Sequence, residues 1–204
     1  MDLFEIVKFA GLVIGAYVLG SVPFGLILTK KFTSINIRTE GSGNIGATNV
    51  RRVAGTKLGL FTLAGDFFKG ALPVYLAGVI TGCDTAFIEL YISVAALAAF
   101  LGHLYPVFLK FQGGGKGVAT AAGCFLVVSP CAFLAAVTAF TIVTCIFRRV
   151  SAGSLTASAV LPVAVWLTDH SIIYTSSAVI ISMFIFFRHR ENIRRLLSGT
   201  EPLI

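Results

Sequence analysis

Residues 118–147 read VATAAGCFLVVSPCAFLAAVTAFTIVTCIF, an apolar run of 30 positions without a charged residue. A membrane-spanning helix needs about 20 apolar residues, so this run is long for one span and short for two. Ser129 and Pro130 stand near its middle, where a proline breaks or turns a helix. The run therefore predicts either one long helix or a helical hairpin that turns at Ser129-Pro130.

The rest of the chain shares this apolar character. It has 204 residues, of which 56% are hydrophobic and 12% are charged, whereas a soluble domain carries about 25% charged residues. The 18 phenylalanines exclude a disordered chain, and no composition typical of collagen or of a disulfide-rich secreted protein is present. We therefore expect an all-α integral membrane protein with a single polytopic domain over residues 1–204.

Five further segments are apolar enough to span a membrane, at about residues 4–29, 58–82, 85–105, 151–168 and 172–187. The N-terminus opens with the acidic residues Asp2 and Glu5 and has no basic region before the apolar segment. It is therefore expected to stay as a span and not to be cleaved as a signal peptide.

The positions of the basic residues favour the hairpin. With a hairpin, 14 of the 16 Lys and Arg residues lie on one side of the membrane, and that side is then cytoplasmic. These residues form four clusters: Lys30, Lys31, Arg38, Arg51, Arg52 and Lys57; Lys110 and Lys116; Arg148 and Arg149; and Arg188, Arg190, Arg194 and Arg195. The other side holds one base, Lys8, and four acids, Asp2, Glu5, Asp84 and Asp169. We expect seven transmembrane helices, with the N-terminus outside and the C-terminus in the cytoplasm.

Residues 39–52, TEGSGNIGATNVRR, are rich in glycine and polar side chains. The glycines match GxGxxG, but no strand precedes them and Asp66 lies in an apolar helix, which excludes a dinucleotide site. Glycines still let backbone N–H groups approach an anion, and Arg51 and Arg52 bring charge suited to phosphate. Further donors are Ser42, Asn44, Thr48 and Asn49. This pattern indicates an anion-binding loop; the alternative is a flexible linker.

Residues 102–120, GHLYPVFLKFQGGGKGVAT, hold a second glycine-rich loop. They do not form a nucleotide P-loop, because Lys110 replaces the first glycine and Gly117 stands where Ser or Thr is needed. The loop nevertheless leads into a helix N-terminus, which favours an anion. Lys116 is then either a phosphate ligand or a lysine that only orients the chain in the membrane.

Two shorter polar segments follow. In 148–154, RRVSAGS, Ser151 or Ser154 either caps the next helix or contacts substrate. In 188–195, RHRENIRR, His189 and Asn192 share a helix face and can hold hydroxyl groups, unless the segment only anchors to anionic lipid.

Asp66 and Lys69 are three residues apart within a span, so a mutual ion pair is expected, with either a structural role or direct contact with substrate. We expect His103 to lie at the membrane interface and His170 to have no part in the site.

No metal-ligand spacing is present, so no metal or cofactor is expected. No basic segment is interleaved with aromatics, which argues against nucleic acid. Three cysteines lie in apolar runs and are expected as free thiols: Cys124, Cys131 and Cys145.

Together, these segments resemble the acyl-phosphate:glycerol-3-phosphate acyltransferase family of bacteria. The matching pieces occur in family order and are 20–25 GSVPFG, 41–49 GSGNIGATN, 66–70 DFFKG, 102–103 GH, 114–120 GGKGVAT and 189–192 HREN. The chain departs from the family at Gln112, which precedes three glycines where a basic residue and two glycines are usual.

The resemblance implies a seven-span enzyme of the bacterial cytoplasmic (inner) membrane, with its active site facing the cytoplasm. Its partners would be glycerol 3-phosphate, a long-chain acyl-phosphate and membrane lipid, and its product lysophosphatidic acid, the first acylation of phospholipid synthesis. By family motif, Ser42, Arg52 and Lys116 would hold phosphate, and Ser154, His189 and Asn192 would orient the glycerol hydroxyls. The candidate catalytic residues are Arg52, Lys116 and His189. The candidate substrate-binding residues are Ser42, Gly43, Asn44, Thr48, Asn49, Ser154 and Asn192, and the candidate supporting residues are Asp66, Lys69 and His103.

The expected mechanism is direct attack of a glycerol hydroxyl on the acyl carbonyl, because an acyl-phosphate is already activated and needs mainly positioning and charge stabilisation. The chain has no GxSxG elbow and no His-x4-Asp motif. The family resemblance implies that substrate phosphate assists proton removal, and His189 is the second choice of base. The alternatives are a transporter of a small phosphorylated anion and a structural subunit of a membrane assembly.

Overall fold

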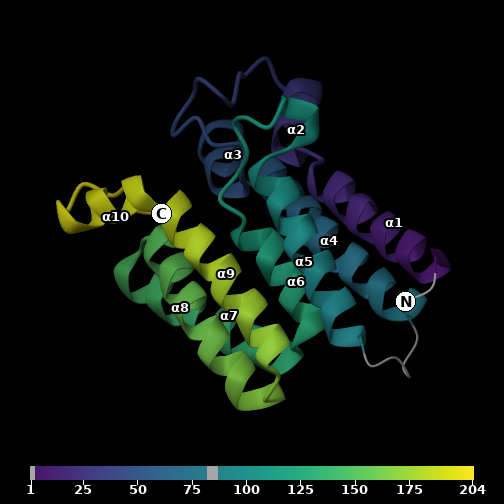
Figure 1. Cartoon of the computed structure of the whole chain (residues 1–204). Helices are drawn as coiled ribbons and strands as arrows, with labels where there is room; N and C mark the ends of the chain where they lie inside the picture. The colour runs from purple at the N-terminus through teal and green to yellow at the C-terminus, as the bar shows by residue number, and fades with distance from the viewer. Residues whose placement is uncertain (1–2, 82–86) are drawn as a thin grey trace. The chain divides into compact units, whose positions relative to one another are not determined.

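The computed structural model describes residues 3–81 and 87–204, and every regular element in these ranges is helical. Two residues used in the sequence analysis, Asp2 and Asp84, lie outside the described residues, as does the start of the span expected at 85–105. The chain divides into two compact units, Met1–Cys124 and Phe125–Ile204, whose helices are labelled in Figure 1.

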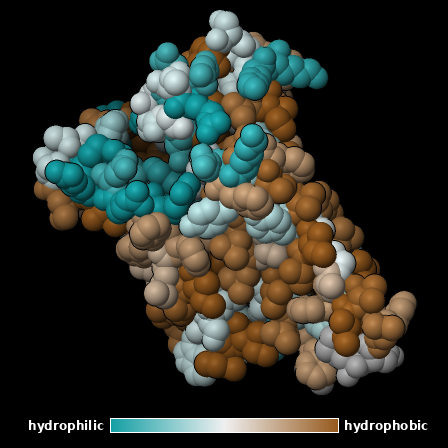
Figure 2. Space-filling view, turned by 45° about the horizontal axis from the view of Figure 1, so that its top comes forward, coloured by the Kyte–Doolittle hydropathy of each residue, from teal (hydrophilic) through white to brown (hydrophobic). Residues whose placement is uncertain are grey.

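The apolar helices confirm an all-helical membrane protein. Five helical segments of the described residues are long and apolar enough to cross a membrane: Leu3–Phe32, Thr56–Thr81, Ile88–Leu109, Pro130–Phe147 and Val150–Asp169. A sixth is reached if Ile172–Arg188 and Arg190–Leu197, which meet at a bend of 60°, form one span. The helix surfaces visible in Figure 2 are mainly hydrophobic, as expected for surfaces that face lipid.

The first span departs from the expectation of one uninterrupted segment at 4–29. It consists of α1 (Leu3–Gly20) and α2 (Phe24–Phe32), with a break at residues 21–23. Pro23 has no backbone N–H to continue the helix. At the break, the carbonyl of Val22 accepts a hydrogen bond of 2.8 Å from the Nζ of Lys69. The charged side chain of another helix thus partners a backbone group at the interruption.

The first unit also contains α3 (Ala47–Ala54), α4 (Thr56–Thr81), α5 (Ile88–Leu104) and the short 3-10 helix η1 (Val107–Leu109). Glycines bring its helices into backbone contact: a Cβ on Gly20 of α1 would overlap the carbonyl oxygen of Ala99 in α5. Helices in lipid associate through such close packing, because lipid tails are as apolar as the side chains. Glycine is therefore needed at this crossing.

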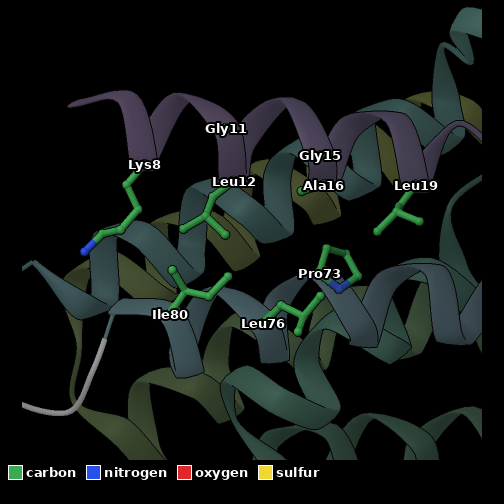
Figure 3. A pocket seen from close by; sticks show the side chains of 9 residues that line it. All are labelled: Lys8, Gly11, Leu12, Gly15, Ala16, Leu19, Pro73, Leu76 and Ile80. Atoms are coloured by element: carbon green, nitrogen blue, oxygen red, sulfur yellow. The ribbon is translucent and has the colours of Figure 1, made fainter. Parts of the chain in front are cut away.

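A cavity of about 310 Å³ lies between α1 and α4 (Figure 3). Leu12, Leu19 and Leu76 point into it, and its one charged lining residue, Lys8, pairs with Glu5 at 2.7 Å. None of the residues predicted to bind substrate lines this cavity. It is an apolar groove, and the candidate site of this unit lies in the loops instead.

The break expected at Ser129-Pro130 within residues 118–147 is confirmed, whereas the hairpin stays a prediction. Helix α6 (Val118–Val128) ends before Ser129, and α7 (Pro130–Phe147) begins after it. The Ser129 hydroxyl donates to the Asp169 carboxylate at 2.5 Å, so the turn meets the end of α8 (Val150–Asp169). The single-helix alternative is therefore wrong. Helix α9 (Ile172–Arg188) and helix α10 (Arg190–Leu197) complete the second unit.

Candidate functional site

The first glycine-rich loop joins α2 to α3 and is anchored by apolar side chains. Ile37 and Ile45 of the loop are buried together with Leu26 of α2 and Val50 of α3. Burial of these side chains holds both ends of the loop against the helices. The loop thereby presents its glycines and polar groups from a fixed base.

Asn49 organises the same loop from within. Its side-chain Nδ2 donates to the carbonyls of Asn44 at 2.9 Å and Glu40 at 3.1 Å, and its Oδ1 accepts from the N–H of Ser42 at 2.9 Å. Gly41 and Gly43 have φ of 61° and 66°, which glycine adopts most readily. This bonded arrangement is not that of the flexible linker considered as the alternative. The role of Asn49 in binding substrate stays a prediction, but its amide already has a structural task.

The polar groups around this loop differ in access. Ser42 and Thr48 are exposed, as is Arg52 on α3, whereas Gly43 and Asn44 are half-buried. The Asn44 side chain accepts from the N–H of Gly46 at 2.8 Å, which shapes the entry to α3. The exposed hydroxyl and guanidinium groups are therefore open to a ligand that arrives from water.

The second glycine-rich loop runs from η1 to α6 in an unusual backbone conformation. Lys110, Phe111 and Gly113 all have positive φ, at 52°, 63° and 67°, and the first two, lacking glycine's freedom, are uncommon there. The N–H of Gly115 donates to the His103 carbonyl at 3.2 Å, and a Cβ on Gly115 would overlap the His103 ring. Lys116, half-buried, precedes α6 by two residues. The predicted helix N-terminus beside this lysine is thus confirmed.

The two glycine-rich loops lie against each other. A Cβ built on Gly113 of the second loop would lie 2.7 Å from Nη2 of Arg38 in the first loop. The contact joins residues 75 positions apart, and nothing in the sequence analysis singled out Arg38 beyond its basic cluster. The structure therefore brings together two segments that the sequence only indicated separately.

A buried charged cluster supports the second loop. Lys69 Nζ lies 2.8 Å from Asp66 Oδ1, which confirms the expected ion pair, and His103 Nδ1 lies 3.6 Å from the same oxygen. All three side chains are buried. Because His103 also packs on Gly115, the cluster connects α4 and α5 to the loop that carries Lys116. Direct contact of these residues with substrate stays a prediction.

In the second unit, the predicted residues lie around the start of α8 and the junction of α9 with α10. His189 is buried at this junction, with Nδ1 2.8 Å from the Ile185 carbonyl oxygen. Ser154 is buried and donates to the Val150 carbonyl at 2.9 Å. The capping alternative is wrong for both serines, because Arg149 occupies the cap position of α8 and no side chain caps the helix.

Glu201 holds this region together, and the sequence analysis missed it. Its Oε1 accepts hydrogen bonds of 2.6 Å from both Ser151 and Asn192, and its Oε2 lies 2.7 Å from Arg195 Nε. Its backbone carbonyl accepts from Arg149 Nε at 3.1 Å. The only sequence feature that could have indicated this role is that Glu201 is an acidic residue shortly after the basic segment 188–195. Asn192, predicted to bind substrate, is thus oriented by a carboxylate.

The network makes the second unit sensitive to acid. Burial raises the pKa of the Glu201 carboxyl, but hydrogen bonds from Ser151, Asn192 and Arg195 and the Arg195 charge outweigh it and leave the pKa below its ordinary value. A carboxyl with a lowered pKa stabilises the folded state above its ordinary pKa, and this stability is lost as pH falls through the folded-state pKa. We expect the protection of residues 190–204 against hydrogen exchange to fall as the pH drops below 4.5, the ordinary pKa of a glutamate carboxyl. Glu201→Gln should exchange faster at neutral pH and lose this acid dependence; an unchanged profile in that variant would contradict the assignment.

These features define a class of protein. The chain is a helical membrane protein in which two glycine-rich loops meet, with Arg52 exposed on the helix that follows one loop and Lys116 within the other. Backbone N–H groups and basic side chains in such loops suit a phosphate. The class is therefore that of membrane proteins that handle a small phosphorylated compound.

The comparisons with known proteins identify the family. Residues 10–199 match the glycerol-3-phosphate acyltransferase family, and the chain belongs to it. It is 47% identical over 190 residues to the glycerol-3-phosphate acyltransferase of Syntrophotalea carbinolica and 49% identical over 190 residues to that of Geotalea daltonii. Each alignment covers 93% of this chain and 94% of the relative.

Solved structures agree. The crystal structure of PlsY, an integral membrane glycerol 3-phosphate acyltransferase, in its glycerol 3-phosphate form matches with a TM-score of 0.90 and 38% identity, covering 97% of this chain and 96% of the other. The lysophosphatidic acid form of PlsY matches with a TM-score of 0.87, covering 97% and 95%. The family resemblance stated from the sequence motifs is confirmed.

Proposed function

We propose that the chain transfers a long-chain acyl group from acyl-phosphate to glycerol 3-phosphate, yielding lysophosphatidic acid and phosphate. The observation that carries the proposal is the contact between the two glycine-rich loops in one unit. It supports an anion site formed by these loops, of which one is followed by Arg52 on α3 and the other carries Lys116. The relatives are glycerol-3-phosphate acyltransferases by name, and the PlsY structures are of glycerol 3-phosphate and lysophosphatidic acid forms. The acceptor glycerol 3-phosphate and the product lysophosphatidic acid of PlsY support the same reaction for this chain.

The membrane arrangement is part of the proposal. The chain spans the bacterial cytoplasmic membrane seven times, with α6 as a short span, its N-terminus outside and its C-terminus inside. The positive-inside rule supports this, because both glycine-rich loops and the α10 helix carry the basic clusters. A site on the cytoplasmic face is where a soluble phosphorylated acceptor arrives.

Phosphate binding is assigned to Ser42, Arg52 and Lys116, and the backbone N–H groups of the first loop around Gly43 and Asn44 assist them. Thr48 adds a hydroxyl at the start of α3, and the Asn49 side chain holds the loop conformation through its hydrogen bonds to the loop backbone. Ser154, His189 and Asn192 orient the glycerol hydroxyls. Asp66, Lys69 and His103 act indirectly, by supporting the second loop.

The chemistry follows from the donor. A hydroxyl oxygen of glycerol 3-phosphate attacks the acyl carbonyl carbon, the carbon–oxygen bond to phosphate breaks, and phosphate leaves with the electron pair. The hydroxyl proton passes to a phosphate oxygen, or alternatively to His189. Lys116 and Arg52 stabilise the negative charge that develops, which is the larger catalytic contribution when the donor is already activated.

The test uses the purified chain in detergent, with palmitoyl-phosphate and glycerol 3-phosphate as substrates and palmitoyl-CoA as a parallel donor. We expect equal amounts of phosphate and lysophosphatidic acid from acyl-phosphate and no product from the CoA donor. Product from palmitoyl-CoA alone would overturn the donor assignment. No product from either donor with a folded sample would overturn the reaction, and uptake of phosphate esters into vesicles would then be measured.

A further inference from the structure

We infer that Arg38 is a further phosphate-binding residue of this enzyme. The inference rests on the proposed function, because the phosphate belongs to glycerol 3-phosphate or to the acyl-phosphate donor. It goes beyond that function because Arg38 is outside the candidate site drawn from the family motifs.

The first observation is the position of the guanidinium. Arg38 belongs to the first glycine-rich loop, and its Nη2 approaches Gly113 so closely that a Cβ there would lie 2.7 Å away. Gly113 has a φ of 67° and stands three residues before Lys116. The guanidinium therefore lies over the loop that is expected to hold phosphate, on the side where glycine leaves the backbone uncovered.

The second observation is charge. Within 3–81 and 87–204, no carboxylate forms an ion pair with Arg38, and its side chain is exposed. It borders a cavity of about 540 Å³ that Lys30 also lines, beside the polar residues Thr33, Ser34 and Asn36. The lining also includes the apolar residues Leu26, Ile35 and Leu109 but no acid, and two cations at such a cavity favour an anionic ligand.

The third argument is chemical, because the guanidinium of Arg38 is suited to bind a phosphate group. A guanidinium presents several N–H donors in a planar fork, which matches two oxygens of one phosphate. Lysine supplies only a point charge at Lys116. Arg38 adds the directional contact from the opposite loop, so that both loops contribute to one anion.

The experiment compares Arg38→Gln, Arg38→Lys and wild type, with Lys57→Gln as the matched control. Lys57 is an exposed cation in the first turn of α4 and has no part in the proposed site. We expect Arg38→Gln to raise the KM of one substrate, glycerol 3-phosphate or palmitoyl-phosphate, about tenfold or more with a smaller change in kcat. The substrate whose KM rises identifies the source of the phosphate. The KM of Arg38→Lys for that substrate should lie between the values of wild type and Arg38→Gln, and the KM values of Lys57→Gln should equal those of wild type.

A second measurement is independent of turnover. Inorganic phosphate should raise the melting temperature of the wild type and of Lys57→Gln more than that of Arg38→Gln. Both KM values within twofold of wild type, with equal protection by phosphate, overturn the inference. If Arg38→Gln does not fold, a folded Arg38→Lys with unchanged constants overturns it equally. A wild type that forms no lysophosphatidic acid but shows phosphate protection dependent on Arg38 refutes the proposed function and leaves this inference standing.

Discussion

Lys116→Ala is expected to lower kcat/KM by about 10²- to 10³-fold, the cost of removing one group that stabilises charge in a transition state. Lys116 lies at the entry to α6, where helix N–H groups favour an anion, and we propose that its side chain binds the same anion. The residue is half-buried, so solvent should weaken its proposed interaction with phosphate less than it would for an exposed lysine. The measurement is phosphate release from palmitoyl-phosphate in the presence of glycerol 3-phosphate.

Lys110→Gln provides the matched control, because Lys110 is an exposed lysine of the same loop. It should keep activity within a few-fold of wild type. Lys116→Arg should recover part of the loss, since the charge is retained while its position changes. Normal turnover by a folded Lys116→Ala would remove Lys116 from the site and return it to the role of an orienting charge.

Asp66→Leu is expected to destabilise the protein by about 3–5 kcal/mol, because it leaves the Lys69 ammonium buried without its carboxylate. The two side chains are only 4% and 3% exposed, and their charged atoms are 2.8 Å apart. The double variant Asp66→Leu, Lys69→Met removes both charges and should recover much of the stability. The measurement is the unfolding midpoint in detergent for each variant.

The protein contains its own control for this prediction. Glu5 and Lys8 form a pair of the same helical spacing at 2.7 Å, but their side chains are 34% and 19% exposed. Glu5→Gln should cost less than about 1 kcal/mol, since this pair is partly open to solvent and such pairs contribute less than buried ones. If the two single variants lose the same stability, burial is not what makes the Asp66–Lys69 pair important.

Features that depend on neighbouring residues could be predicted from the sequence. The break at Ser129-Pro130 follows from a proline inside an apolar run, and the Asp66–Lys69 pair follows from opposite charges one helical turn apart in a span. The glycine-rich loops were likewise visible as local composition. Each of these depends on residues close in the chain, so the pattern alone carries the information.

Features that depend on distant residues could not be predicted. Arg38 reaches Gly113, and Glu201 reaches Ser151, through contacts for which no sequence pattern is available. The interruption of the first span was missed because Pro23 stands among apolar residues. Lys69, which donates a hydrogen bond to the Val22 carbonyl at the break, lies 47 positions further along the chain. The seven-span count and the orientation stay predictions, because they depend on the membrane as well as on the chain.

The Glu201 contacts also impose an order on biosynthesis. Ser151 is made 50 residues before the carboxylate that it binds, an interval of about 3–10 s at ordinary rates of translation. During that interval, Ser151 lacks the carboxylate that accepts its hydrogen bond. A chain that ends before residue 201 would therefore keep all of its apolar helices but lack the carboxylate that joins Ser151, Asn192 and Arg195.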